Sequence, residues 1–195
     1  NRPAPNITAA RIDNPAIYWL MTSMLRRQSQ LFNLYVGYDD GSFLEVDFID
    51  RAGPSFRQRL DAPPGAVYRL LIIRPSIDGI PRSATTTYLS ADLIALAETF
   101  APADYDPRNR PWYVDAHEPG TNVLTPPYIF FASGQPGYTL RLPVKTGRHG
   151  VVAGDILLTE ADQILKAQRL GRSGFAFLFD AAGHIVVHPR MSELI

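Results

Sequence analysis

The densest group of chemically capable side chains lies between residues 105 and 113, in the sequence Tyr-Asp-Pro-Arg-Asn-Arg-Pro-Trp-Tyr. A guanidinium group can bind both oxygens of a carboxylate, and aromatic faces around it exclude water. The indole N–H is a donor only, so it also suits an anion. The segment therefore predicts a carboxylate-binding site with Arg110 as its cation and Trp112 and Tyr113 beside it.

Asp155 is the best candidate for an opposing anion. It stands between the apolar stretches 151–153 and 156–158. A buried carboxylate is costly unless a cation or hydrogen-bond donors satisfy it. The alternative is that Asp155 lies at a strand end, where it is solvated or caps the next helix. Both interpretations stay open at this point.

The other members of the 105–113 segment also have structural interpretations. Arg110 can form an ion pair with Asp106 or Asp115 instead of binding a ligand. Trp112 and Tyr113 can be core aromatics, and their position beside Arg110 favours a mixed role. Tyr105 is expected to pack within the segment, and Arg108 is expected to be exposed or paired with a preceding acidic residue.

Signals of enzymatic chemistry are weak. The chain has no cysteine, and it has no Gly-x-Ser-x-Gly, Gly-x-Gly-x-x-Gly or phosphate-loop motif. His184 and His188 fall on an expected strand, where four residues span about 13 Å, too far for one metal ion. We therefore expect no catalytic residues, no metal site and no cofactor.

Composition limits the class of protein further. The 195 residues carry 19 basic and 19 acidic side chains, and 46% are hydrophobic. Balanced charge gives no electrostatic footprint for nucleic acid, and the apolar share is enough for a core. No run approaches the roughly 18 apolar residues of a membrane-spanning helix, and no signal peptide is recognisable. The abrupt ends suggest a segment of a longer protein.

Apolar spacing and turn residues predict the elements that position these side chains. A helix should begin at Asn14-Pro15, with Asn as the N-cap. Its expected apolar stripe is Ile17, Leu20, Met21, Met24 and Leu25. A second helix should follow Ser90, with Leu93, Leu96 and Phe100 as its stripe. A third should begin at Thr159 and stop at Gly171.

Strands account for most of the remaining chain. A hairpin is expected at 31–49 around Asp39-Asp40-Gly41, and single strands at 67–73, 85–89, 128–131, 138–144 and 151–158. A second strand–turn–strand unit at 175–187 repeats the plan of the first hairpin about 140 residues later. Two similar hairpins suggest two modules of one architecture.

The pattern Tyr105-x4-Arg110-x-Trp112-Tyr113, with Tyr128 and Gly154-Asp155-Ile156 further on, resembles the double Cache sensor family over nearly the whole chain. The resemblance implies an α+β fold of PAS-like antiparallel sheets flanked by helices. It implies that Arg110 and Trp112 bind a ligand carboxylate, and that Tyr113, Tyr128 and Asp155 surround an ammonium group; we include Tyr105 in the expected site.

One position departs from the amino-acid-binding members of that family. They often carry an acidic residue two positions after the tyrosine that matches Tyr128, and here that position is Phe130. The ammonium site would then hold one carboxylate instead of two. The expected ligands are therefore an amino acid, an amine or a short carboxylate.

The resemblance also implies an organisation. Residues 1–14 would be a lead-in, 15–158 a membrane-distal ligand-binding module, and 159–195 the start of a truncated membrane-proximal module. The domain would be periplasmic and anchored by membrane helices outside this chain. In the family a long N-terminal helix mediates dimer contacts, and most of that helix is absent here, so a homodimer of this chain would be weak. The alternative function is a scaffold that binds no ligand and serves dimerisation or the docking of a periplasmic protein.

Overall fold

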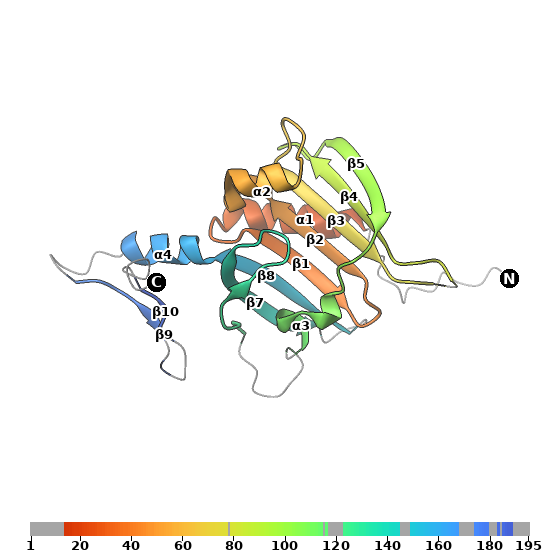
Figure 1. Cartoon of the computed structure of the whole chain (residues 1–195). Coiled ribbons are helices and arrows are strands. Elements are labelled where there is room, and N and C mark those ends of the chain that lie inside the picture. Colours follow the sequence, from red (N-terminus) through yellow and green to blue (C-terminus); the bar gives the residue numbers. More distant parts are fainter. Residues whose placement is uncertain are drawn as a thin grey trace.

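The computed structural model describes residues 14–77, 79–114, 116, 123–144, 149–167, 174–179, 183 and 185–188. Its main feature is an eight-stranded antiparallel sheet in the order β5-β4-β3-β2-β1-β8-β7-β6 (Figure 1). The strands are β1 Asn33–Tyr38, β2 Phe43–Phe48, β3 Tyr68–Arg74, β4 Ser83–Leu89, β5 Ala95–Pro102, β6 Tyr128–Ile129, β7 Pro136–Val144 and β8 Gly150–Leu157. The expected α+β, PAS-like fold class is confirmed.

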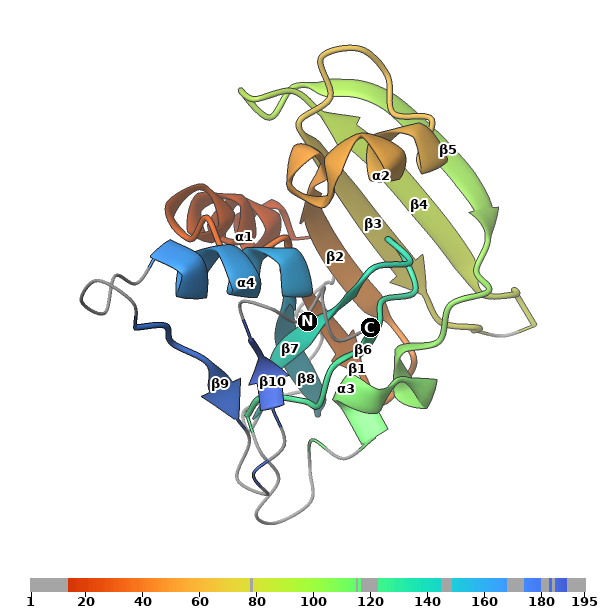
Figure 2. The ribbon, with the colours of Figure 1, turned by 60° about the vertical axis from the view of Figure 1, so that its left-hand side comes forward.

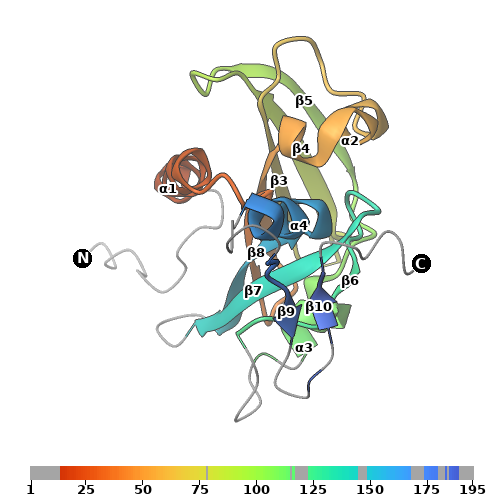
Figure 3. The same ribbon diagram turned by 90° about the vertical axis from the view of Figure 1, so that its left-hand side faces the viewer.

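Helices cover both faces of this sheet. They are α1 Pro15–Arg27, α2 Gly53–Arg59, α3 Pro111–Val114 and α4 Leu158–Ala167, with short 3-10 turns at Ile49–Ala52 and Pro107–Asn109. Viewed along the sheet, α1 lies on one side, and α2 and α3 lie on the other (Figure 3). The sequence analysis assigned no element to residues 50–66, so α2 was missed.

Alternation along the central strands separates two kinds of buried face, because successive side chains of a strand point to opposite sides. On β1 and β2, the side chains toward α1 are apolar: Leu34, Val36, Leu44 and Val46 belong to the cluster that includes Met21 and Leu25. The intervening side chains face α2 and α3, and several of these are polar and buried: Asn33, Glu45 and Asp47. The second face is therefore the one equipped for binding.

The first hairpin forms as expected. β1 and β2 pair in antiparallel register, with Val36 opposite Leu44. Gly41 has φ +79° in the connecting turn, a conformation that glycine adopts without steric cost.

Helix α1 begins where the sequence predicts. Its N-cap is Asn14, whose side chain accepts a hydrogen bond from the backbone N–H of Ala16, and Pro15 is its first residue. The expected stripe is wrong at two positions, because Leu20 is 62% and Met24 is 44% exposed. Only a narrow stripe around Met21 and Leu25 contacts the sheet.

The helix expected after Ser90 is wrong, because this segment is strand β5 at the edge of the sheet. The Ser90 hydroxyl accepts from the backbone N–H groups of Asp92 and Ile94, which closes a turn instead of capping a helix. Leu93 has φ +62°, a left-handed conformation that cannot continue a right-handed helix.

The C-terminal elements pack against the end of this sheet (Figure 2). Helix α4 begins at Leu158, one residue before the expected Thr159, directly after β8. Strands β9 Leu178–Phe179 and β10 Ile185–Val187 form a separate antiparallel pair, which agrees with the second strand–turn–strand unit. Gly171 and His184 lie outside the described residues. The division into modules at 158/159 stays a prediction.

Across the described part of the chain, no helix combines the length and apolarity needed to cross a membrane.

Candidate ligand-binding site

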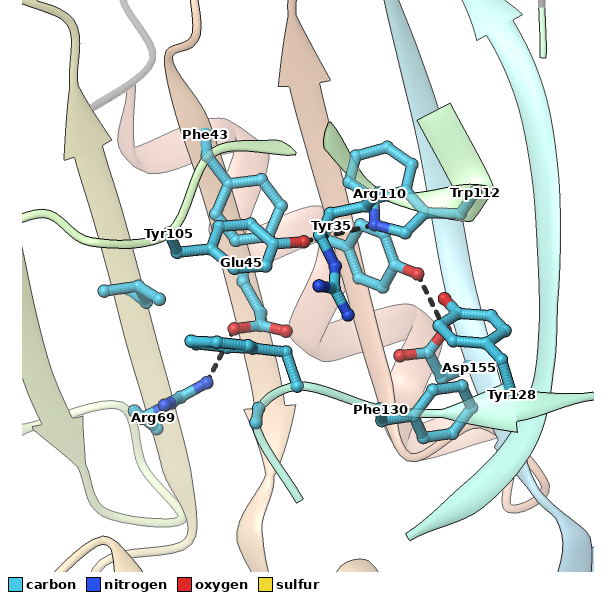
Figure 4. Close-up of a pocket in the computed structure, with 13 residues that line it drawn as sticks. Tyr35, Phe43, Glu45, Arg69, Tyr105, Arg110, Trp112, Tyr128, Phe130 and Asp155 are labelled. Carbon is cyan, nitrogen blue, oxygen red and sulfur yellow. Dashed lines mark hydrogen bonds and ion pairs between the residues drawn. The ribbon is translucent and has the colours of Figure 1, made fainter. Parts of the chain in front are cut away.

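A cavity of about 80 Å³ lies on the α2 and α3 side of the sheet (Figure 4). Its floor comes from β1, β2, β3 and β8, and its cover from the 105–112 segment and residues 128–132. Five of the six expected site residues line it: Tyr105, Arg110, Trp112, Tyr128 and Asp155. The chain thus brings together residues up to fifty positions apart in the sequence.

Arg110 reaches into the cavity, with Glu45 on one side of its side chain and Asp155 on the other (Figure 4). Its guanidinium carbon lies 5.8 Å from the ring centre of Tyr105 and 5.4 Å from that of Phe131. Asp106 pairs instead with Arg82 and Arg108, and Asp115 lies outside the described residues. Within the described residues, no carboxylate forms an ion pair with Arg110.

Trp112 and Tyr105 form one aromatic unit. The indole N–H of Trp112 donates to the Tyr105 hydroxyl over 3.1 Å, and Trp112 is only 2% exposed. The Trp112 ring packs against Tyr35 at 4.7 Å between centroids. The indole therefore forms a wall and orients Tyr105, since its single donor is already engaged.

Tyr113 does not line the cavity. Its hydroxyl donates to the carboxylate of Asp39 in the β1–β2 turn, and it packs edge-on against Trp112. Arg108 is exposed and hydrogen-bonds both oxygens of Asp106 at 2.9 and 2.7 Å, as the sequence analysis anticipated. These residues fasten the 105–114 segment to the sheet.

Asp155 lies within β8 and is 5% exposed, so the interpretation as a solvated strand end is wrong. Its carboxylate accepts hydrogen bonds from Tyr35 at 2.7 Å, Thr139 at 2.6 Å and Asn33 at 3.0 Å. All three donors are neutral. Burial raises the pKa of Asp155 to about 6, although these hydrogen bonds oppose the rise.

Tyr128 stands beside this carboxylate. Its hydroxyl shares a 2.7 Å hydrogen bond with the Thr139 hydroxyl, which in turn donates to Asp155. Burial raises the pKa of Tyr128, and the negative charge of Asp155 adds to the rise. The phenol therefore stays neutral and borders the anionic side of the cavity.

The structure adds a buried ionic network that the sequence analysis missed. Arg69 donates to Glu45 over 2.6 Å and to Asp47 over 2.5 Å. Glu45 and Arg69 line the cavity, whereas Asp47 lies behind them. Asn33 links this network to the predicted site, because its amide nitrogen donates to both Glu45 and Asp155.

A sequence signal for the network existed. In the stretch Phe-Leu-Glu-Val-Asp-Phe of β2, Glu45 and Asp47 alternate with Leu44 and Val46. A central strand of a sheet covered on both sides buries both of its faces, so charged residues at every second position indicate a buried polar network. That argument requires knowing that β2 is central, which the local sequence does not reveal.

An antiparallel PAS-like sheet with a charged, aromatic-walled cavity on one face is the architecture of a small-molecule sensor module. No protein-family model matches the chain. The chain is 30% identical to adenylate cyclase 1 of Rhizobium meliloti over 165 residues, which are 84% of this chain and 24% of that protein. It is 40% identical to the methyl-accepting chemotaxis protein PctB of Pseudomonas aeruginosa over 96 residues, 48% of this chain and 15% of that protein.

Solved structures give the same result. The ligand-binding domain of the Pseudomonas fluorescens chemoreceptor CtaA, in complex with L-valine, matches 93% of this chain and 61% of its own, with 26% identity and a TM-score of 0.52. The chain thus spans a quarter or less of the two curated relatives and under two thirds of the CtaA domain. The resemblance to double Cache sensor domains is confirmed by these similarities in sequence and fold.

Proposed function

We propose that this chain is the extracytoplasmic sensor region of a bacterial membrane receptor and binds a small carboxylate-bearing ligand, with an amino acid as the leading class. The carrying observation is the Arg110 side chain, which is partly buried, enters the cavity and forms no ion pair with any described carboxylate. A partly desolvated guanidinium that faces a cavity is free to form a charge-assisted, bidentate pair with a carboxylate. The ligand supplies that carboxylate.

The opposite side of the cavity suits the cationic end of the same ligand. Among the described residues, Asp155 accepts side-chain hydrogen bonds only from neutral donors, so no described cation compensates its negative charge. Tyr105 and Phe131 flank Arg110 and shield its ion pair with the ligand carboxylate from water. The lower local dielectric strengthens that ion pair. An amino acid would thus span from Arg110 to Asp155.

The size of the cavity restricts the ligand. A volume of about 80 Å³ holds on the order of six water-sized groups, since each needs roughly 10–15 Å³. Small amino acids and short organic acids match that size, and longer ones must extend toward the opening.

Signalling would follow from differential binding. The cavity lies between the sheet and the 105–112 segment, so a ligand that contacts both favours the arrangement in which they are closed on one another. An equilibrium of two arrangements shifts only by the difference in the ligand's affinity for them. This function involves no catalytic step. The output of the whole receptor would depend on its other regions.

Thermal unfolding and calorimetric titration with amino acids, amines and short carboxylates test the proposal. At least one carboxylate-bearing compound should raise the melting temperature, and Arg110→Ala should lower its affinity at least tenfold, because a charge-assisted hydrogen bond contributes about 1.5–3 kcal/mol. Arg27→Ala is the matched control, since Arg27 is exposed on α1.

Full affinity in Arg110→Ala would refute the role of that residue. If no compound stabilises the folded protein, the scaffold alternative replaces ligand sensing.

A further inference from the structure

The cavity, together with Asp47 of the adjacent Arg69 network, brings three carboxyl groups to two guanidinium groups, so the group is anionic when all of them are ionised. Asp155, Glu45 and Asp47 are all buried carboxylates. Arg69 is shared by Glu45 and Asp47, so one guanidinium faces two carboxylates. The side-chain donors to Asp155 in the described part of the chain are all neutral. A zwitterion that places its carboxylate on Arg110 and its ammonium near Asp155 adds no net charge, so the third carboxyl group must bind a proton or remain an uncompensated charge.

The excess charge is concentrated between Glu45 and Asp155. The Asn33 amide nitrogen donates to Glu45 over 3.1 Å and to Asp155 over 3.0 Å, so the two carboxylates approach each other across a single nitrogen atom. Both line the cavity, and Figure 4 shows them on the same floor of the sheet. A ligand group entering there meets two carboxyl groups.

We propose that Glu45 is a specificity-determining residue and that the cavity prefers ligands with one more cationic than anionic group, namely basic amino acids with short side chains. The inference rests on the proposed ligand-binding function and deepens it. The α-carboxylate contacts Arg110, and the two ammonium groups divide between Asp155 and Glu45. The second carboxylate thus comes from β2, on the floor of the cavity, and not from the position of Phe130.

The charged surroundings of Glu45 indicate that binding of a basic ligand is coupled to loss of a proton from Glu45. Asp47 on the same strand and Asp155 on β8 repel its charge, Arg69 on β3 attracts it, and Tyr105 and Arg110 face it from the covering segment. Burial is the largest influence and, with Asp47, raises the pKa of Glu45 to about 8. Without ligand, Glu45 is therefore mostly protonated at pH 7. A ligand cation beside Glu45 favours the carboxylate and expels that proton.

Calorimetric titration with two length-matched ligand pairs tests the proposal. L-2,4-diaminobutyrate is compared with L-norvaline, and L-ornithine with L-norleucine, so that an ammonium group replaces a methyl group in each pair. The basic member of at least one pair should bind at least tenfold more tightly. Repeating the titration at pH 7 in buffers of different ionisation enthalpy should reveal release of about one proton with the basic ligand and none with the neutral one.

Two variants distinguish a direct contact between Glu45 and the ligand from a structural role of Glu45. Glu45→Gln preserves size and hydrogen bonding, and should abolish both the preference and the proton release while retaining neutral amino acid binding. That retained binding also shows that the cavity is intact. Asp47→Asn is the matched control: Asp47 contacts Arg69 but does not line the cavity, so the preference should persist.

The outcomes distinguish this inference from the proposed function. Tighter binding of the neutral ligands, or an equal loss of preference in both variants, overturns the role of Glu45 and leaves amino acid sensing in place. An absence of binding by every amino acid, amine and carboxylate contradicts both.

Discussion

Asp155 makes the stability of the folded protein depend on pH, because its carboxyl group is buried among neutral donors. Its pKa of about 6 in the folded protein exceeds the value of 3.8 for an ordinary aspartate. The folded state therefore holds this proton more tightly than the unfolded state does. The resulting stabilisation is complete below about pH 4 and is lost as the pH rises through 6.

Asp155→Asn should consequently flatten the pH dependence of stability. In the ligand-free protein, the free energy of unfolding should fall between pH 4 and pH 7 by roughly 2–3 kcal/mol more in the wild type than in the variant, since each pKa unit corresponds to about 1.4 kcal/mol. Urea denaturation across this range measures the difference. Asp92→Asn, at an exposed position, should retain the wild-type slope. Parallel profiles for Asp155→Asn and the wild type would contradict the raised pKa.

At the residue scale, the sequence identified the side chains whose chemistry is unusual for their surroundings. Arg110 among aromatics and Asp155 within an apolar run do meet at one cavity. The sequence analysis did not identify Glu45 and Arg69 as site residues, because each lies in a strand with no unusual local pattern. They become partners only through the pairing of β2 with β3, in which Asp47 lies opposite Arg69. Such cross-strand partners follow from register, which single stretches of sequence do not specify.

At the scale of elements, the 105–114 segment depends on a close approach to β1. A Cβ atom at Gly37 would lie 2.8 Å from the Trp112 ring and 2.9 Å from Pro107. Real Cβ atoms do not come so close, so any side chain at position 37 forces the cover away from the sheet. The absence of a side chain there lets Trp112 approach β1 closely and form a wall of the cavity.

Gly37→Ala should therefore destabilise the protein by about 1–3 kcal/mol, the usual cost of overpacking, and weaken ligand binding. Fluorescence in a Trp19→Phe background isolates Trp112, since the chain has two tryptophans, and should shift toward the emission of a solvated indole. Trp112→Phe removes the atom nearest to the new methyl group, so its cost should be smaller in the Gly37→Ala background than alone. Additive costs would show that the two positions do not interact.

Elements buried against a partner were easier to predict than those at an edge. The hairpin of β1 and β2 carries turn residues and a two-residue period, and it forms where expected. Strand β5 pairs only with β4 and is exposed along most of its length. Its apolar residues Leu96 and Phe100 are therefore exposed and do not mark a buried face. Their spacing of four residues also fits a helix, which is why a helix was predicted. The left-handed conformation of Leu93 and the hydrogen bonds to Ser90 form a turn, which excludes the predicted helix.

At the scale of the whole molecule, a small apolar cluster among the described residues joins the C-terminal strands to the large sheet. Val187 of β10 is 2% exposed and forms a cluster with Tyr138 of β7, against which Leu124, Leu158 and Leu165 pack. A two-stranded hairpin alone is marginally stable in water. We therefore expect the position of the β9–β10 pair to depend on this cluster.

Val187→Ala should loosen this connection without unfolding the large sheet. Removing two methyl groups from a buried site costs about 1–3 kcal/mol, which is comparable to the whole stability of an isolated hairpin. Hydrogen exchange of the complete chain should become faster in β9, β10 and the end of α4, and remain unchanged in β1, β2, β3 and β8. Ile185→Ala is the matched control, because Ile185 lies on the same strand and is 50% exposed. Faster exchange throughout the eight-stranded sheet would mean that the C-terminal elements and the sheet unfold as one cooperative unit, and the predicted division near residue 158 would then be wrong.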